Sequence, residues 1–125
     1  TADDLAKYAA LLIRGGEYGK LRYLLPFTIA DFSQTPQGYK DNYRGYGFDK
    51  PNPKKRGTYY VPAAVSLKSY GHIGFTGTIL WIDPEQDFFA IVLSNRTYPD
   101  SNNTRINSMR LRAAIIEALY KSITQ

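Results

Sequence analysis

The chain has 125 residues, of which 43% are hydrophobic and 22% charged, a composition typical of one globular domain and not of disordered or membrane-spanning chains. It contains no cysteine, which excludes disulfide frameworks, thiolate zinc sites and cysteine nucleophiles. It has one histidine and no Gly-rich phosphate loop, so we expect neither a metal site nor another cofactor. No apolar run approaches the ~20 residues that span a bilayer.

The net charge of +5 raises the question of a basic binding surface. The tightest basic run covers residues 50–56, where Lys54, Lys55 and Arg56 are adjacent and Pro51 and Pro53 lie nearby. Charge runs in such loops usually face water, so we expect no nucleic-acid partner. A small basic binding module is the weakest of three functional hypotheses, and a steep salt dependence of nucleic-acid binding would support it.

The first predicted element is a helix that begins at Thr1 and ends at Gly15-Gly16. Thr1 and Asp4 have the spacing of a capping box, and glycine tolerates the left-handed conformation that follows a last helical turn. One buried face is predicted by the apolar stripe Leu5, Tyr8, Ala9, Leu12 and Ile13. After a connector over 17–24, Pro26 begins a second helix that extends to about Phe32. Because the chain starts in a helix cap without an initiating Met, we expect a piece of a longer protein.

Residues 34–66 are predicted to be mostly irregular. Short strands are possible over 45–48 and 59–65, although Pro62 excludes the second from the centre of a sheet. Tyrosine is frequent in this part of the chain and suits either the wall of a cleft or packing at the edge of the core. The tyrosines concerned are Tyr39, Tyr43, Tyr46, Tyr59, Tyr60 and Tyr70.

The strongest strand signal lies in the C-terminal half. Residues 71–74 lead into an apolar run over 78–82, and a polar turn over 83–87 joins it to a second run over 88–93, which predicts an antiparallel hairpin. Neither run alternates cleanly, so we expect both strands to be central in a layered sandwich. A long helix over 104–122 should cover one face of the sheet. Its predicted core stripe is Ile106, Met109, Ala113, Ile116 and Tyr120.

The only histidine, His72, lies in a glycine-rich segment that is a candidate functional site. Glycine weakens a strand, so Gly74 and Gly77 indicate either a close approach of a ligand or another chain, or a bulge beside an ordinary surface histidine. A complete catalytic set is absent. None of the seven serines is followed three residues later by Lys, the spacing at which a lysine activates a serine nucleophile. No carboxylate pair of the glycosidase kind stands out either.

Several motifs together resemble the C-terminal signature of the serine β-lactamase-like family, which includes class C-type β-lactamases, DD-peptidases and related esterases. They are Gly71-His72-Ile73-Gly74-Phe75-Thr76-Gly77-Thr78, Leu80-Trp81-Ile82-Asp83-Pro84 and Leu93-Ser94-Asn95-Arg96-Thr97-Tyr98-Pro99. Residues 1–26 are similar to a segment of the family's helical subdomain. The resemblance implies an α+β fold, the C-terminal portion of the β-lactamase/transpeptidase-like fold. It would have a central antiparallel sheet, a covering C-terminal helix and an N-terminal helical segment. Residues 1–125 would form one partial domain, with a helical segment and loop over 1–44 and strands and helix over 45–125.

The resemblance also implies a site. His72, Ile73 and Gly74 would occupy the family's third motif, with His72 as the catalytic residue. Ile73, Gly74, Phe75 and Thr76 would bind substrate, and a backbone N–H near Gly74 or Phe75 would complete an oxyanion hole. Ile73 replaces the usual Thr or Ser, and a mostly neutral histidine replaces the usual lysine. Both changes favour ester-like acyl substrates over β-lactams or D-Ala-D-Ala peptides.

The expected function is therefore that of a C-terminal fragment of a serine acyl hydrolase, inactive alone because it lacks Ser-x-x-Lys. Its expected partners are a small-molecule acyl substrate and the missing N-terminal part of the same protein. Self-association through an open sheet edge is also expected. Family habit implies a periplasmic or extracellular location. The alternative is a non-catalytic β-lactamase-like domain appended to another cell-wall enzyme, such as a glycosidase.

Overall fold

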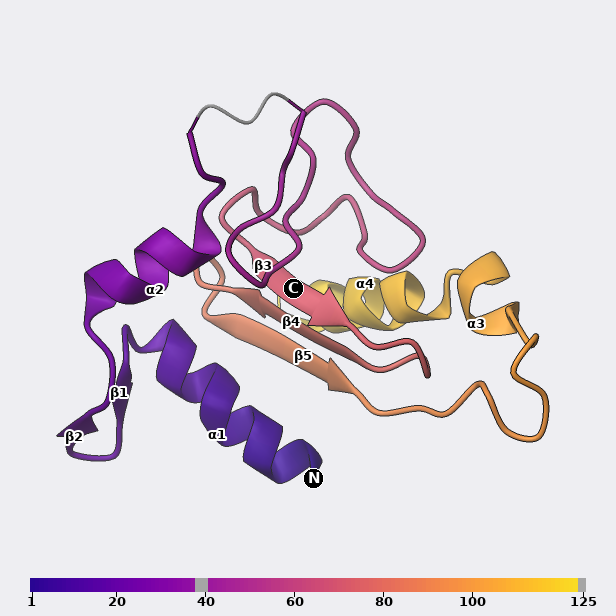
Figure 1. The fold of residues 1–125 in the computed structure, drawn as a ribbon, viewed down its shortest axis with the longest axis horizontal. Helices are drawn as coiled ribbons and strands as arrows, with labels where there is room; N and C mark the ends of the chain where they lie inside the picture. The colour runs from indigo at the N-terminus through magenta and orange to yellow at the C-terminus, as the bar shows by residue number, and fades with distance from the viewer. Residues whose placement is uncertain (38–40, 124–125) are drawn as a thin grey trace.

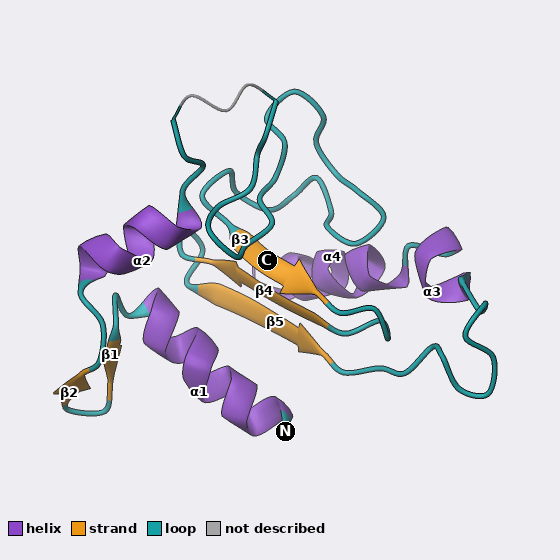
Figure 2. Ribbon diagram, in the orientation of Figure 1, coloured by secondary structure: helices purple, strands orange, loops and turns teal. Residues whose placement is uncertain are grey.

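The computed structural model describes residues 1–37 and 41–123, so Tyr39 lies outside the described residues. The described part forms a three-stranded antiparallel sheet with helices on both faces (Figures 1 and 2). An irregular segment over 41–69, between the second helix and the sheet, lies alongside the sheet edge formed by residues 70–73, with a bridge from Asp49 to Gly71. This arrangement is the expected mixture of helices and antiparallel sheet.

The N-terminal segment contains helix α1 (Ala2–Ile13) and helix α2 (Pro26–Ser33). The Thr1 side chain accepts a hydrogen bond from the backbone N–H of Asp4, and the reciprocal bond is also present, so the capping box is confirmed. The chain then turns back through Gly15 and Gly16, both at positive φ. The connector predicted over 17–24 forms a short antiparallel hairpin, in which strands β1 (Glu17–Tyr18) and β2 (Leu21–Arg22) have two residues each.

The main sheet has the order β3-β4-β5, with strands β3 (Tyr70–Ile73), β4 (Ile79–Asp83) and β5 (Phe88–Val92). Tyr70 pairs with Ile82 across β3 and β4, and Ile79 pairs with Val92 across β4 and β5. The predicted hairpin is confirmed. The prediction that both of its strands are central is wrong, because within the described residues β5 pairs only with β4 and lies at an edge.

The core has two layers, one on each face of the sheet. Side chains alternate along β4, so Ile79 and Trp81 face one side while Leu80 and Ile82 face the other. The first layer consists of Val61, Val65, Ile79, Trp81, Phe88, Ala90, Ile116 and Tyr120. The second consists of Ala9, Leu12, Tyr70 and Ile82. The two layers explain why the β4 sequence does not alternate between apolar and polar residues.

The predicted C-terminal helix is broken into α3 (Arg105–Ser108) and α4 (Leu111–Ile123). The break lies at Met109 and Arg110, and Arg110 has a φ of 52°, which no continuous right-handed helix contains. The break turns Met109 outward, with 69% of its surface exposed, so its predicted place in the core is wrong. The other stripe residues, Ile106, Ala113, Ile116 and Tyr120, are buried as predicted.

The segment over 41–69 forms neither of the two short strands that the sequence allowed. Its shape depends on cations that donate to backbone carbonyls. Arg56 bonds the carbonyl of Ala63 at 2.7 Å and also that of Val65, and Lys50 bonds the carbonyl of Ser69 at 3.3 Å. Part of the basic run therefore stabilises the fold through these hydrogen bonds.

Within the described ranges, no helix is long and apolar enough to cross a membrane.

Candidate active site at the end of strand β3

The glycine-rich segment forms the tight connection between β3 and β4. The N–H of Gly74 bonds the carbonyl of Thr78 at 2.9 Å, and the N–H of Gly77 bonds the carbonyl of Gly74 at 3.0 Å. A Cβ on Gly74 would lie 2.1 Å from Thr78 Oγ1, and one on Gly77, at φ +106°, would lie 2.5 Å from Ser94 Oγ. Close packing within the chain therefore accounts for both glycines.

His72 lies on β3 opposite Leu80, with an exposed side chain. Its Nδ1 is 2.8 Å from the carbonyl oxygen of Ile73, and its Nε2 is 3.3 Å from Nη2 of Arg44. A carbonyl only accepts hydrogen bonds and a guanidinium only donates them. The two contacts therefore assign a neutral ring that carries its proton on Nδ1 and a lone pair on Nε2.

Arg44 is itself held in place by Asp49. Its Nη1 lies 2.5 Å from Oδ1 of Asp49, whose side chain is only 8% exposed. The backbone of Asp49 exchanges two hydrogen bonds with Gly71, at 2.7 and 3.0 Å, and so ties this loop to the start of β3. Sequence reasoning missed Arg44 and Asp49, because Arg44 is 28 positions from His72 and no local motif connects them.

A half-open hollow of about 240 Å³ lies at the end of β3. Three of the predicted site residues, Ile73, Gly74 and Phe75, lie along it. The remaining lining residues are Tyr59, Arg96, Asn107 and Arg112. His72 is not among them, because alternation along β3 turns its ring to the opposite face from Ile73. Thr76 is also absent from the lining, and its carbonyl accepts a bond from the N–H of Arg96 at 2.8 Å.

The backbone N–H of Phe75 has no hydrogen-bond partner among the described residues, whereas those of Gly74 and Gly77 are engaged. The Phe75 ring is exposed, and the guanidinium carbon of Arg96 lies 4.4 Å from its centroid. A free backbone donor beside a hollow is the geometry with which proteins stabilise a developing oxyanion. The described residues contain no group of three or more His, Asp or Glu side chains that could hold a metal ion.

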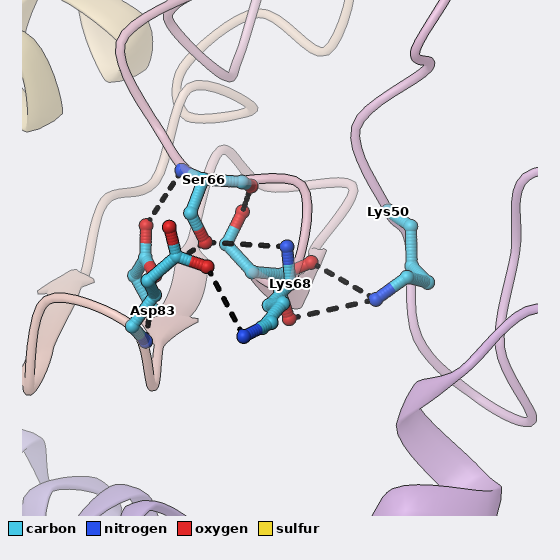
Figure 3. A network of polar contacts seen from close by, with 6 residues as sticks. Lys50, Ser66, Lys68 and Asp83 are labelled. Atoms are coloured by element: carbon cyan, nitrogen blue, oxygen red, sulfur yellow. Dashed lines mark hydrogen bonds and ion pairs between the residues drawn. The ribbon is translucent and has the colours of Figure 1, made fainter.

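A second polar cluster, centred on the buried carboxylate of Asp83, lies at the opposite end of β4 (Figure 3). Asp83 accepts bonds from the N–H and hydroxyl of Ser66 at 2.7 and 2.6 Å, from the N–H of Glu85 at 3.1 Å, and from the hydroxyl of Tyr120. Ser66 and Lys68 are close in sequence, but Nζ of Lys68 lies 3.5 Å from Glu85. This lysine therefore does not activate the serine, and the cluster holds loops together.

Comparison with known proteins places this geometry in a family. The model of the β-lactamase family matches residues 1–114. The chain belongs to the β-lactamase family. This is a family of serine hydrolases, and the resemblance read from the sequence is confirmed.

Two similar proteins, from Salmonella gallinarum and Salmonella paratyphi B, carry the provisional name D-alanyl-D-alanine carboxypeptidase. They are 31% and 30% identical over 104 residues, which is 83% of this chain but only 23% of each relative. A β-lactamase structure from Mycobacterium bovis aligns with a TM-score of 0.63 at 24% identity, over 96% of this chain and 44% of that one. The last likeness shows the fold, and its coverage is consistent with a C-terminal portion of the β-lactamase fold.

Proposed function

We propose that this chain forms the third-motif side of the active site of a serine acyl hydrolase. The observation that carries the proposal is the unengaged N–H of Phe75, at the end of β3 and beside a hollow. Ile73 and Gly74 position this donor, and Ile73, Gly74, Phe75 and Thr76 would form the edge along which substrate lies. The proposed division is a helical segment and loop over 1–44 and the sheet with its covering helix over 45–125.

The reaction would proceed through an acyl-enzyme. A serine hydroxyl attacks the substrate carbonyl and passes its proton to a base, and the resulting oxyanion accepts a hydrogen bond from the Phe75 N–H. The leaving group then departs with a proton, and water hydrolyses the acyl-serine. One oxyanion-hole donor contributes about 3–4 kcal/mol to transition-state stabilisation. No serine of this chain has the Ser-x-x-Lys spacing, so the nucleophile and its lysine would come from sequence outside it.

We propose His72 for proton transfer at the leaving group, a role in which its ring would have to turn from the opposite face of β3 and release the contact with Arg44 or with the Ile73 carbonyl. Ile73 has no hydroxyl for a substrate carboxylate, which favours esters and related acyl compounds. The name of the Salmonella relatives makes D-alanyl-D-alanine peptides the competing substrate class. A periplasmic or extracellular location is part of the proposal and follows from family habit.

The decisive experiment labels this chain, and the longest protein that contains it, with a fluorescent fluorophosphonate and a fluorescent penicillin. We expect labelling of the longer protein only, and the probe that reacts separates ester from β-lactam chemistry. Labelling of the 125-residue chain would mean that one of its own serines is activated and that the proposal is wrong. Labelling of neither would favour a non-catalytic domain appended to another cell-wall enzyme.

A further inference from the structure

A second open hollow, of about 400 Å³, lies where α1 and α2 approach the start of β3. The two helices give it an apolar wall, formed by Leu12, Pro26, Ile29 and Ala30. Its polar side is formed by Lys50, Lys68 and Tyr70. We call it the Lys50 hollow, and its lining combines an aliphatic surface with cations from the segment that precedes β3.

Lys50 is the cation of this hollow that has no acidic partner. Its Nζ donates to the carbonyl oxygens of Lys68 and Ser69 at 3.5 and 3.3 Å (Figure 3). Within residues 1–37 and 41–123 it forms no ion pair, whereas Lys68 pairs with Glu85. An ammonium group has three N–H donors, so one N–H of Lys50 remains for a ligand.

Burial makes the charge of Lys50 costly. It lowers the pKa of Lys50, and the negative charge of Asp83 opposes this effect only in part. The carboxylate of Asp83 is already bonded to Ser66 and Tyr120 and does not come within ion-pair distance of Lys50. An anion placed against Nζ would therefore offset a cost that no described carboxylate removes.

Tyr70 supplies an unused hydrogen-bond donor to the same hollow. It is 2% exposed, and its hydroxyl has no hydrogen-bond partner among the described residues. A buried tyrosine hydroxyl usually finds a partner, so an acceptor is expected beside it. Nζ of Lys50 lies 5.8 Å from the centroid of the Tyr70 ring, which puts the charge and the hydroxyl-bearing ring next to each other.

We propose that the Lys50 hollow binds an alkyl carboxylate, with the carboxylate at Lys50 and Tyr70 and the aliphatic chain along α1 and α2. The carboxylate would accept a charge-assisted bond from the ammonium group and a bond from the hydroxyl. Acetate or inorganic phosphate would leave the apolar wall uncovered, and an alcohol would leave the charge of Lys50 uncompensated. The hollow lies at the opposite end of β3 from the Phe75 N–H, so its occupation does not depend on the proposed reaction.

The test is isothermal titration calorimetry at constant ionic strength, with this chain and with the longest protein that contains it. The ligands are hexanoate, 1-hexanol, acetate and inorganic phosphate. Hexanoate should bind about tenfold or more tightly than each of the others, because only hexanoate has both a charge and an aliphatic chain. Equal affinity for hexanol would show an apolar groove alone, equal affinity for acetate or phosphate would show a charge alone, and either result would overturn the proposal.

Ala30→Glu tests the location without removing a contact of the fold. Ala30 is exposed on α2 and lines the hollow, so the new carboxylate should compete for Lys50 and weaken hexanoate binding by about tenfold or more. Ala118→Glu is the matched control, since Ala118 is an exposed alanine of α4 that does not line the hollow, and binding should persist. Full hexanoate affinity in Ala30→Glu would overturn the proposal.

Lys50→Met tests the cation itself. It also removes the two bonds to backbone carbonyls, so its thermal unfolding is measured beside hexanoate binding. Loss of binding at a Tm where the variant is still folded supports the proposal, and a variant that is less stable but binds hexanoate as the wild type does would overturn it.

Two outcomes with the longer protein identify other occupants and other sites. If this chain binds hexanoate but the longer protein does not, a carboxylate of that protein fills the hollow and the assignment to a small molecule is wrong. If labelling of the longer protein with a fluorophosphonate abolishes hexanoate binding, hexanoate binds at the reacting serine and the assignment to the Lys50 hollow is wrong. Binding that persists in both cases is the expected result.

Discussion

His72 shows how two fixed partners can select one form of a side chain. The Ile73 carbonyl requires a proton on Nδ1, and the Arg44 guanidinium requires a lone pair on Nε2. Asp49 anchors Arg44, so the arrangement depends on a loop that is distant in sequence. Histidine can either donate or accept at each nitrogen, and its neighbours therefore decide which chemistry it offers.

We predict that Arg44→Met changes the tautomer of His72. In the wild type the proton should reside on Nδ1, and without the Arg44 donor the form protonated on Nε2 should become substantially populated. Nitrogen-15 NMR resolves this directly, because the chain has one histidine. Lys54→Met is the control, since Lys54 pairs with Asp41 and not with His72. Unchanged imidazole shifts in Arg44→Met would refute the assigned contact.

Asp83 is a residue whose change should cost much stability, because its buried carboxylate accepts several hydrogen bonds. Asp83→Asn replaces acceptors with an amide donor that faces the Ser66 and Tyr120 donors, so we expect a loss of about 3 kcal/mol in the free energy of unfolding. Urea denaturation measures this loss. Asp87→Asn, in the same turn, is exposed and tolerant of its positive φ, and should change stability by less than about 0.5 kcal/mol. Similar losses in both variants would contradict the network.

At the scale of elements, the sequence predicted the helix starts and ends that depend only on neighbouring residues. The capping box at Thr1, the stop at Gly15-Gly16 and the Pro26 helix start all follow from contacts within a few positions. The break at Arg110 could not be predicted, because its left-handed backbone occurs at a residue type that gives no signal for it. The burial of Asp83 was missed for a related reason, since Ser66 and Tyr120 are 17 and 37 positions away.

The candidate site likewise contains residues that a local motif could predict and residues that it could not. The motif located Ile73, Gly74 and Phe75, which lie together along the hollow. The motif could not reveal that β-strand alternation separates His72 from them, or that Arg96 and Arg112 approach from other elements. Those facts depend on how the irregular segment and the broken C-terminal helix pack on the sheet.

The β3–β4 connection gives a test at this scale. Gly77→Ala would place a Cβ 2.5 Å from Ser94 Oγ and 2.8 Å from Ile106 Cδ1 at a φ of +106°, so we expect a loss of roughly 3 kcal/mol. Gly19→Ala is the matched control, with positive φ but open space around the added methyl, and should cost about 1 kcal/mol. Chemical denaturation of the two variants compares them, and equal costs would show that the connection is looser than described.

For the whole molecule, two buried tyrosines, Tyr70 and Tyr120, and the partly buried Tyr60 predict a loss of stability at alkaline pH. Burial raises the pKa of Tyr60 and Tyr70 to about 12, and burial together with the Asp83 bond raises the pKa of Tyr120 as well. An unfolded tyrosine ionises near pH 10, whereas these three stay protonated in the fold. Their stabilisation is therefore complete below about pH 10. It should fall by up to about 4 kcal/mol per pH unit between pH 10 and 12.

Urea unfolding at pH 9, 10 and 11 measures this dependence. Tyr70→Phe should reduce the slope by about 1.4 kcal/mol per pH unit, because one fewer tyrosine releases its proton on unfolding. Tyr98→Phe is the control, since Tyr98 is 80% exposed and should leave the slope unchanged. A slope that does not respond to Tyr70→Phe would contradict the burial of that hydroxyl.

Within the part of the chain that the structure describes, the outer edge of β5 is unpaired, so self-association of the chain is a prediction that stays open to test. Leu93 follows this edge and is half exposed, so Leu93→Lys should shift the sedimentation equilibrium toward monomer. Leu67→Lys, at a similarly exposed leucine in the irregular segment before β3, should leave the equilibrium unchanged. A wild-type chain that is monomeric at all concentrations would contradict the prediction that chains associate through the edge of β5.

The two-layered core also gives the chain a reporter of its own. Trp81 is the only tryptophan, is fully buried, and lies in the layer between the sheet and α4, with the Tyr60 ring 6.3 Å away. Its fluorescence emission should change when the layer between the sheet and α4 unfolds. It should change little when α1 detaches from the other face of the sheet. Fluorescence and circular dichroism melts that diverge would therefore reveal which side of the sheet opens first.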